Sequence, residues 1–128
     1  MESSRHQQGF TLIELLVVIS IMAILAMVAI PRFTASVTMA NTAKIQADLQ
    51  NIDTAIVLYQ LQNGTAPRNI AVDLEPYLQD ADKILPPKGN CFLKGTSEAT
   101  EIKAATYALN AKGDRAVLQE HIASDFGR

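Results

Sequence analysis

An uninterrupted apolar segment near the N-terminus constrains this chain more than any other feature of its sequence. Between Phe10 and Ile30, 18 of 21 residues are hydrophobic, and no charged residue occurs between Glu14 and Arg32. As an α-helix, 21 residues extend about 31 Å, which matches the hydrocarbon thickness of a bilayer. The segment therefore predicts a membrane-spanning helix. The alternative, a signal peptide cleaved near Ala29, is disfavoured by the length of the run and its weakly basic start.

The remaining composition excludes several classes of function. A chain of 128 residues normally supports one small domain plus an appendage. The formal net charge of −2 argues against binding of nucleic acid through bulk positive charge. A single cysteine excludes an internal disulfide, and with two histidines a dedicated zinc site is not expected.

Glu14 is the anomalous residue of the apolar segment. A carboxylate inside an apolar helix costs a few kcal/mol unless it lies near the interface or is paired. Two explanations stay open at this point. The side chain reaches toward the lipid headgroups, or it meets a positive charge that another chain supplies.

The residues around Glu14 carry a resemblance to a known family. The run Gly9-Phe10-Thr11-Leu12-Ile13-Glu14-Leu15 resembles the processing motif of type IV prepilins and type II secretion pseudopilins. The resemblance implies that a prepilin peptidase cuts between Gly9 and Phe10 and methylates the new amine of Phe10. It also implies that Glu14 and Pro31 are the family's assembly glutamate and its usual proline. Cleavage would place a cationic amine near Glu14, and that amine could neutralise Glu14 of its own chain or of a neighbouring copy. Pairing with a neighbour would set the register between copies, which is not a catalytic role.

A second helical pattern follows the apolar segment. Pro31 frees one backbone carbonyl, so a kink or local melting is expected there. Beyond it, apolar residues recur at helical spacing and predict a stripe that packs against the molecule's own core; the stripe consists of Ile45, Leu49, Ile52, Ile56 and Tyr59. The polar residues between them are expected to form a solvated face; they are Lys44, Gln46, Asp48, Gln50, Asn51 and Asp53. Asn63-Gly64 predicts the helix end.

The last 64 residues predict a small head. A loop is expected over 83–90, a short strand over 91–93 and a β-hairpin from strands 101–110 and 115–119, with a frayed tail over 120–128. The expected fold class is therefore α+β, a long N-terminal helix packed against a small antiparallel sheet, as in pilins. The expected divisions are a leader (1–9), a transmembrane and filament-core helix (10–31), an amphipathic helix half (32–64) and the head (65–128).

Candidate chemistry in the head is sparse. We find no catalytic constellation, and the sequence predicts no enzyme. Cys91 beside Phe92 is interpreted as a small buried hydrophobic residue, with an exposed thiol as the alternative. Cofactors are not expected. Asp80 and Asp82 are candidates for a calcium site, because some pseudopilins bind calcium in a head loop. They are weak candidates, because the EF-hand pattern is absent.

The resemblance favours a structural function. It implies a subunit held in the bacterial cytoplasmic membrane by one span, with an extracytoplasmic head, and then polymerised into a periplasmic or cell-surface filament. The implied partners are copies of itself, the prepilin peptidase, an assembly ATPase and an inner-membrane platform protein. We favour a major-type pseudopilin of a type II secretion or related system.

Two alternatives stay open. The first is a pilin of a type IV pilus or of a competence system for DNA uptake, in which six basic side chains would gather on one face of the head; these are Lys83, Lys88, Lys94, Lys103, Lys112 and Arg115. Acidic residues are interspersed among them, which favours a mixed, solvated surface. The second alternative is a single-pass, membrane-anchored binding domain.

Overall fold

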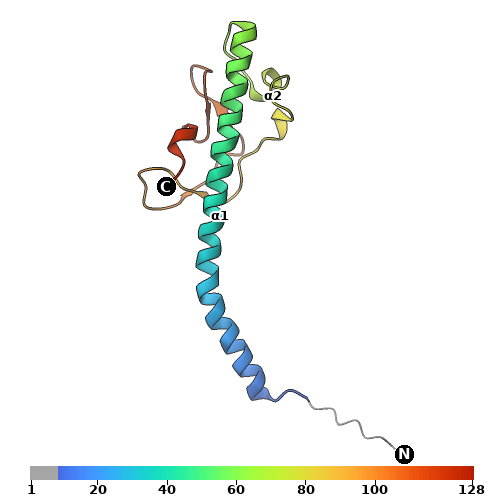
Figure 1. Ribbon diagram of the computed structural model, residues 1–128, viewed down its shortest axis with the longest axis vertical. Coiled ribbons are helices and arrows are strands. Elements are labelled where there is room, and N and C mark those ends of the chain that lie inside the picture. The colour runs from blue at the N-terminus through green and yellow to red at the C-terminus, as the bar shows by residue number, and fades with distance from the viewer. Residues whose placement is uncertain (1–8) are drawn as a thin grey trace, which may run out of the picture. The chain divides into compact units, whose positions relative to one another are not determined.

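One long helix runs through both units of the molecule. The computed structural model describes residues 9–128 and separates into two compact units that meet between Ala35 and Ser36. Helix α1 (Leu12–Asn63) begins in the first unit and continues into the second (Figure 1). Each unit is described by itself below.

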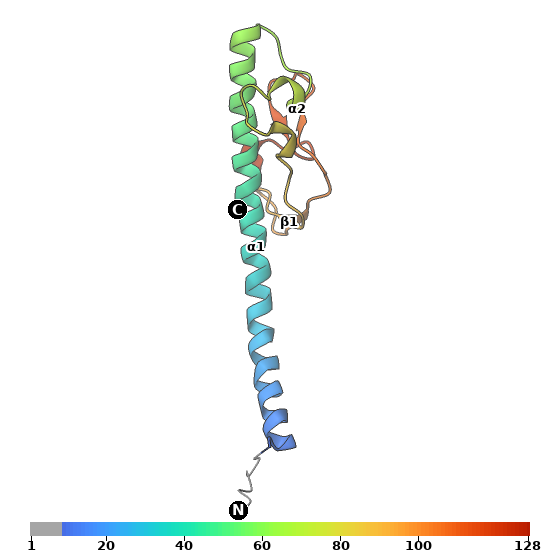
Figure 2. The same cartoon turned by 90° about the vertical axis from the view of Figure 1, so that its right-hand side faces the viewer.

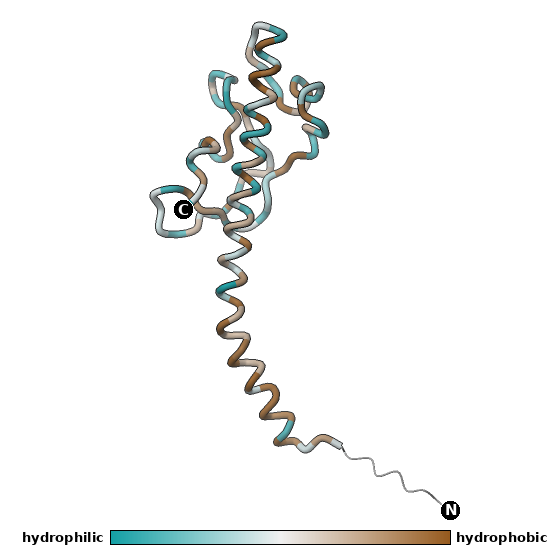
Figure 3. Tube along the Cα trace, viewed as in Figure 1, coloured by the Kyte–Doolittle hydropathy of each residue, from teal (hydrophilic) through white to brown (hydrophobic). Residues whose placement is uncertain are grey.

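The first unit consists of the N-terminal part of α1. Every side chain from Leu12 to Ala35 is exposed, and hydrophobic residues cover this part of the helix (Figure 3). Among the described residues, α1 is the helix that is long and apolar enough to cross a membrane. Pro31 lies inside the helix, which continues on both sides of it. The local melting expected at Pro31 does not occur, because a proline disrupts only the bonds of its own turn and the flanking turns keep theirs.

The second unit is built around the remaining part of α1. Figure 2 shows the head segments gathered on one side of this part of the helix. Four residues at helical spacing are completely buried there, namely Ile45, Leu49, Ile52 and Ile56. They form one core cluster with Leu74, Tyr107, Leu118 and Phe126. Burying a side chain of this size contributes about 1.5–3 kcal/mol, so this face of the helix is the main source of stability for the head.

Four two-residue strands form two separate antiparallel ladders. Strand β1 (Asn90–Cys91) pairs with β2 (Thr100–Glu101), and β3 (Ala108–Leu109) pairs with β4 (Ala116–Val117). The α+β class is confirmed, but the single sheet and the long strands of the predicted hairpin are wrong. At the end of β2 a side chain takes the place of a backbone partner. Gln119 Oε1 accepts the amide of Lys103 at 2.9 Å, just after β2 ends.

Short helices complete the head. They are α2 (Ile70–Asp73) and two 3₁₀ turns, η1 (Ala81–Lys83) and η2 (Ala123–Asp125). Asn69 caps α2, since its Oδ1 accepts the amide of Ala71 at 2.9 Å. The carboxylate of Asp73 accepts the amide of Arg68 at 2.7 Å and that of Asn69 at 3.0 Å, so the turn is closed from both ends.

The expectation of a frayed tail over 120–128 is wrong, because Ala123 and Phe126 are buried in the core. Phe126 is 2% exposed and forms an isolated β-bridge with Leu93. Gln46 Nε2 donates to the carbonyl of Phe126 at 2.7 Å. One large aromatic side chain therefore anchors a segment whose composition alone is typical of a mobile end.

The polar face of α1 in the second unit is also different from the expectation. Asp53 Oδ1 accepts the amide of Ala116 at 2.6 Å, and Asp48 accepts the hydroxyl of Tyr107 at 2.7 Å. Lys44 pairs with Asp48 and donates to the carbonyl of Leu85 at 3.2 Å. Asp48 and Asp53 are only partly exposed and hold the head on the helix, whereas Lys44 is exposed, as expected, although it also contacts the head. Gln50 and Asn51 are exposed, as expected.

Candidate processing and assembly site

The predicted processing site precedes the first turn of α1. Gly9 and Phe10 lie outside any helix or strand, and the Phe10 side chain is 87% exposed. Among the described residues beyond its chain neighbours, no heavy atom lies within 4 Å of the position that a Cβ on Gly9 would occupy. Residues 1–8 of the predicted leader lie outside the described residues. A peptide bond in this open, irregular backbone is accessible to a processing enzyme.

Thr11 and Glu14 form a capping box at the start of the helix. The amide and the hydroxyl of Thr11 each donate to Glu14 Oε2 at 2.8 Å. In return the amide of Glu14 donates to Thr11 Oγ1 at 3.3 Å. This is the reciprocal pattern in which a threonine before a helix and a glutamate three residues later satisfy the free amides of the first turn. The carboxylate is therefore paired within its own chain, an arrangement that we did not foresee from the sequence.

Other polar groups of the apolar part of α1 are satisfied in the same way. Ser20 Oγ donates to the carbonyl of Leu16 at 2.7 Å, and Thr34 Oγ1 donates to that of Ile30 at 3.1 Å. Hydrogen bonds within the chain lower the cost of placing these polar groups in lipid. Pro31, the other predicted assembly residue, is exposed and lies within the helix.

The predicted packing stripe lies in the head. Ile45, Leu49, Ile52 and Ile56 belong to the core, and Tyr59 is partly buried against it. Tyr59 meets Tyr77 edge to face at a ring-centroid distance of 6.0 Å. The stripe therefore serves the molecule's own head, while the exposed apolar residues of the first unit are available to other molecules.

The side chains near the candidate calcium site are otherwise engaged. Asp80 Oδ1 pairs with Lys83 Nζ at 2.6 Å, and Asp82 is exposed. Over residues 9–128, no three His, Cys, Asp or Glu side chains lie close enough to hold a metal ion together. Asp80 itself has a left-handed backbone, with a φ of 54°.

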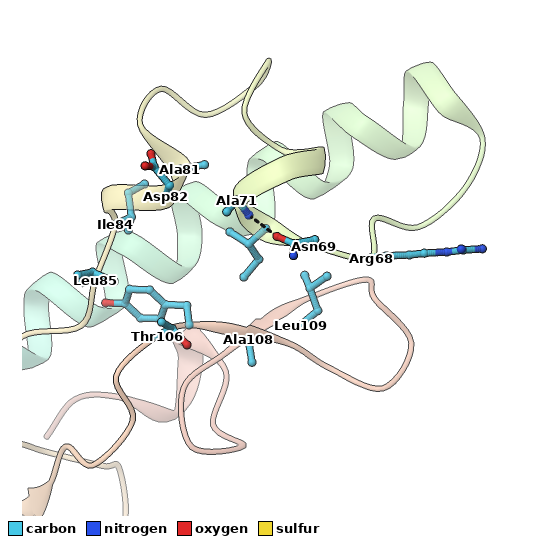
Figure 4. Close-up of a pocket in the computed structure, with 12 residues that line it drawn as sticks. Arg68, Asn69, Ala71, Ala81, Asp82, Ile84, Leu85, Thr106, Ala108 and Leu109 are labelled. Atoms are coloured by element: carbon cyan, nitrogen blue, oxygen red, sulfur yellow. Dashed lines mark hydrogen bonds between the residues drawn. The ribbon is translucent and has the colours of Figure 1, made fainter.

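A cleft of about 480 Å³ opens between residues 68–85 and strand β3 (Figure 4). Apolar groups of Ile84 and Leu109 contribute to its walls, and the Arg68 side chain extends away from it. The side-chain oxygen of Asn69, at its rim, caps α2. Asp82, Thr106 and Tyr107 also line the cleft, but among the described residues no hydrogen bond joins them as nucleophile, base and orienting group, the set that hydrolytic catalysis needs.

Cys91 lies in the core, where its thiol donates to the carbonyl of Thr100 at 3.6 Å. Burial raises the pKa of the Cys91 thiol, which lowers its reactivity. The basic residues considered for DNA binding are partly neutralised, since Lys83 pairs with Asp80 and Lys103 lies 3.9 Å from Glu101.

Comparison with known proteins gives the family. The family model of the prokaryotic N-terminal methylation motif matches residues 4–30. The type IV wide pilus major component PilA4 of Thermus thermophilus is 36% identical over 109 residues, which cover 80% of this chain and 83% of that protein. The chain belongs to the type IV pilin family. Competence protein ComGC of Halalkalibacterium halodurans is 31% identical over 78 residues, covering 60% of this chain and 76% of ComGC.

Similarity to secretion proteins is confined to a shorter region. The type II secretion system core protein G of Klebsiella michiganensis is 38% identical over 63 residues, which cover 49% of this chain and 44% of that protein. The match therefore spans less than half of the core protein. No solved structure gives a significant match.

These relatives confirm the structural reading of the chain. It is a pilin-like structural subunit and not an enzyme, as predicted. Membership of the family also establishes association with copies of itself in a filament and association with the membrane through the apolar helix.

Proposed function

We propose that this pilin is cut between Gly9 and Phe10 by a prepilin peptidase, methylated on the Phe10 amine and polymerised through α1. The observation that carries the proposal is the processing motif placed directly before a capped helix whose apolar side chains from Leu12 to Ala35 are all exposed. Such a surface is stabilised when it is removed from water, and both the lipid bilayer and the packed interior of a filament provide this.

In this proposal the subunit first resides in the cytoplasmic membrane. The part of α1 before Pro31 spans the bilayer, and the head lies on the extracytoplasmic side. An assembly ATPase and an inner-membrane platform protein then transfer it into a filament in the periplasm or at the cell surface. A head-to-tail contact that does not close on itself generates such a filament from identical copies.

Glu14 is the proposed assembly residue. Its carboxylate lies one turn from the amine that cleavage creates at Phe10. In a medium of low dielectric constant, the attraction between a carboxylate and an ammonium of adjacent copies is strong, and it is greatest when the two groups are in contact because it falls with distance. The pair therefore favours one axial position of each incoming subunit over positions one turn away.

We favour a major-type pseudopilin of a type II secretion or related system. Support comes from the recurring similarity to core protein G of several bacteria. A type IV pilus subunit is the second candidate, because the alignment with PilA4 extends over 80% of this chain and includes the head. Deletion of the gene separates them: loss of protein secretion supports the first, and loss of surface pili or of motility supports the second.

The processing step is tested by intact mass and N-terminal sequencing after co-expression with a prepilin peptidase. A chain that begins at methylated Phe10 supports the proposal, and an inactive peptidase is the control. Gly9→Val adds a branched side chain at the cut and is expected to leave the chain uncleaved. Efficient cleavage of Gly9→Val, or a chain that begins at Met1 with active peptidase, would contradict the proposed cut.

We infer further that the subunit works without a cofactor. The alternative, calcium at Asp80 and Asp82, would have to break the ion pair between Asp80 and Lys83. Calorimetric titration of the purified subunit with calcium, beside Asp82→Asn, tests the inference. Saturable binding that this substitution removes would contradict it.

A further inference from the structure

The two oxygens of the Glu14 carboxylate have different surroundings. Both hydrogen bonds from Thr11 reach Oε2, at 2.8 Å each. Among the contacts of residues 9–128, Oε1 has no hydrogen bond. Because α1 exposes this turn, Oε1 is open to a donor from outside the chain.

We propose that Thr11 is a positioning residue for filament assembly, which holds Oε2 so that Oε1 is presented to the cationic amine of a neighbouring copy. The proposal rests on the assembly role of Glu14 given above. It adds a residue that does not itself meet the neighbour.

The Thr11 hydroxyl is suited to this role because it is held from both sides. It accepts the amide of Glu14 at 3.3 Å and donates to Oε2 of the same residue. The carboxylate is thus fixed relative to the helix backbone before any partner arrives. A glutamate side chain without these hydrogen bonds would rotate freely before docking and would lose that freedom on docking, at a cost in conformational entropy.

The arrangement also explains how the subunit can wait in the membrane. One oxygen of the carboxylate is satisfied inside the chain, which lowers the cost of placing Glu14 near lipid. The other oxygen still favours a cationic partner. A carboxylate bound to its own chain through both oxygens would have less to gain from assembly, and an unbound one would be more costly to store.

The competing explanation is that Thr11 only caps the helix. Loss of a cap typically costs about 1 kcal/mol of helix stability, and this cost would be paid whether or not residue 14 is charged. A positioning role instead requires the charged oxygen on Glu14. The two explanations therefore predict different effects of removing the Thr11 hydroxyl from a variant in which Glu14 has already been replaced by an uncharged residue.

The experiment uses the full chain with its peptidase and assembly proteins, and measures the ratio of filament subunit to methylated membrane subunit. Thr11→Val removes the hydroxyl, Thr11→Ser keeps it, and Ser20→Ala is the matched control, since Ser20 also bonds a backbone carbonyl in the apolar segment. Thr11→Val is expected to lower the ratio roughly tenfold, as for a lost hydrogen bond to a charged group. Thr11→Ser and Ser20→Ala are expected to stay within about twofold of the wild type.

A double-mutant cycle with Glu14→Gln decides between the explanations. Thr11→Val should have no further effect in the Glu14→Gln background. An equal loss in both backgrounds would overturn the proposal, as would failure of Thr11→Ser to restore filaments. A block of cleavage in Thr11→Val would also overturn it, because a processing role would then account for the hydroxyl. If Glu14→Gln alone forms normal filaments, the assembly role of Glu14 fails instead.

Discussion

The hydrogen bond between Tyr107 and Asp48 offers a direct test of how the head is held on α1. Tyr107 precedes strand β3 and is 7% exposed. Its hydroxyl donates to Asp48 on the helix at 2.7 Å. Tyr107→Phe removes this single oxygen and leaves the ring in the core. The substitution therefore isolates one polar contact between α1 and the segments that cover it.

The expected loss follows from the partners of the carboxylate. A hydrogen bond to a charged group contributes about 1.5–3 kcal/mol. Asp48 keeps its ion pair with Lys44 after the substitution, so it does not become an unpaired charge. We therefore expect a loss of about 1.5 kcal/mol in the free energy of unfolding, at the lower end of that range.

The loss should also depend on pH in a defined direction. Burial, followed by the hydrogen bond and the charge of Asp48, raises the pKa of Tyr107 above its ordinary value of about 10. The folded state therefore keeps a proton that the unfolded state releases. This contribution is complete below about pH 10 and declines as the pH rises further, so the wild type should approach Tyr107→Phe in stability above that pH.

The assay is urea unfolding of the full chain in a mild detergent, followed by circular dichroism. Tyr59→Phe is the matched control, because the Tyr59 ring is partly buried while its hydroxyl has no hydrogen bond among the described residues. The control should change the stability by less than about 0.5 kcal/mol. Equal stability of Tyr107→Phe and Tyr59→Phe would refute the idea that polar contacts hold the head on α1.

Three further predictions concern other parts of the head. Leu49→Ala, at a completely buried site, should cost about 2–5 kcal/mol in urea unfolding, whereas Leu61→Ala, at a site 77% exposed, should change little. Gly113→Ala should lower the free energy of unfolding by about 1–3 kcal/mol, because φ is +69° and the new Cβ would lie 3.0 Å from the carbonyl oxygen of Pro67. Gly95 also has a positive φ, of +80°, but has open space around it. Gly95→Ala therefore measures the backbone strain without a close contact. Hydrogen bonds from the amides of Arg68 and Asn69 lower the pKa of Asp73. The first turn of α2 should therefore be intact above about pH 4 and loosen as the pH falls through the lowered pKa, which amide chemical shifts can follow. Asp73→Asn should abolish this acid transition.

The helical parts of the fold could be predicted from the sequence because their patterns are local. The apolar run, the spacing from Ile45 to Ile56 and the Asn63-Gly64 end each depend on neighbours within a few residues, and Gly64 has the expected positive φ of 70°. The capping box was also present as a local pattern, Thr11-Leu12-Ile13-Glu14. The same residues also belong to the processing motif, so the local pattern alone does not single out the capping role.

The head was predicted less well because its contacts join distant residues. Asp53 and Ala116 are 63 positions apart, and Gln46 and Phe126 are 80 positions apart. Charged and amide residues at regular spacing on a helix are usually solvated, and no local pattern distinguishes those that bind a loop. Contacts of this kind hold short strands on the helix, and the predicted hairpin is present with shorter strands, in which Leu109 pairs with Ala116.

The order of these contacts along the chain has a consequence for biosynthesis. The helix that carries the buried face is translated first, and almost every residue that covers it follows. A nascent head therefore meets a template that has already emerged from the ribosome, and each short ladder can form only once it lies on that template. Premature termination anywhere before Phe126 would leave the face of Ile45 and Leu49 partly uncovered. We therefore expect such truncated chains to expose apolar surface and to be degraded faster than chains that carry Phe126.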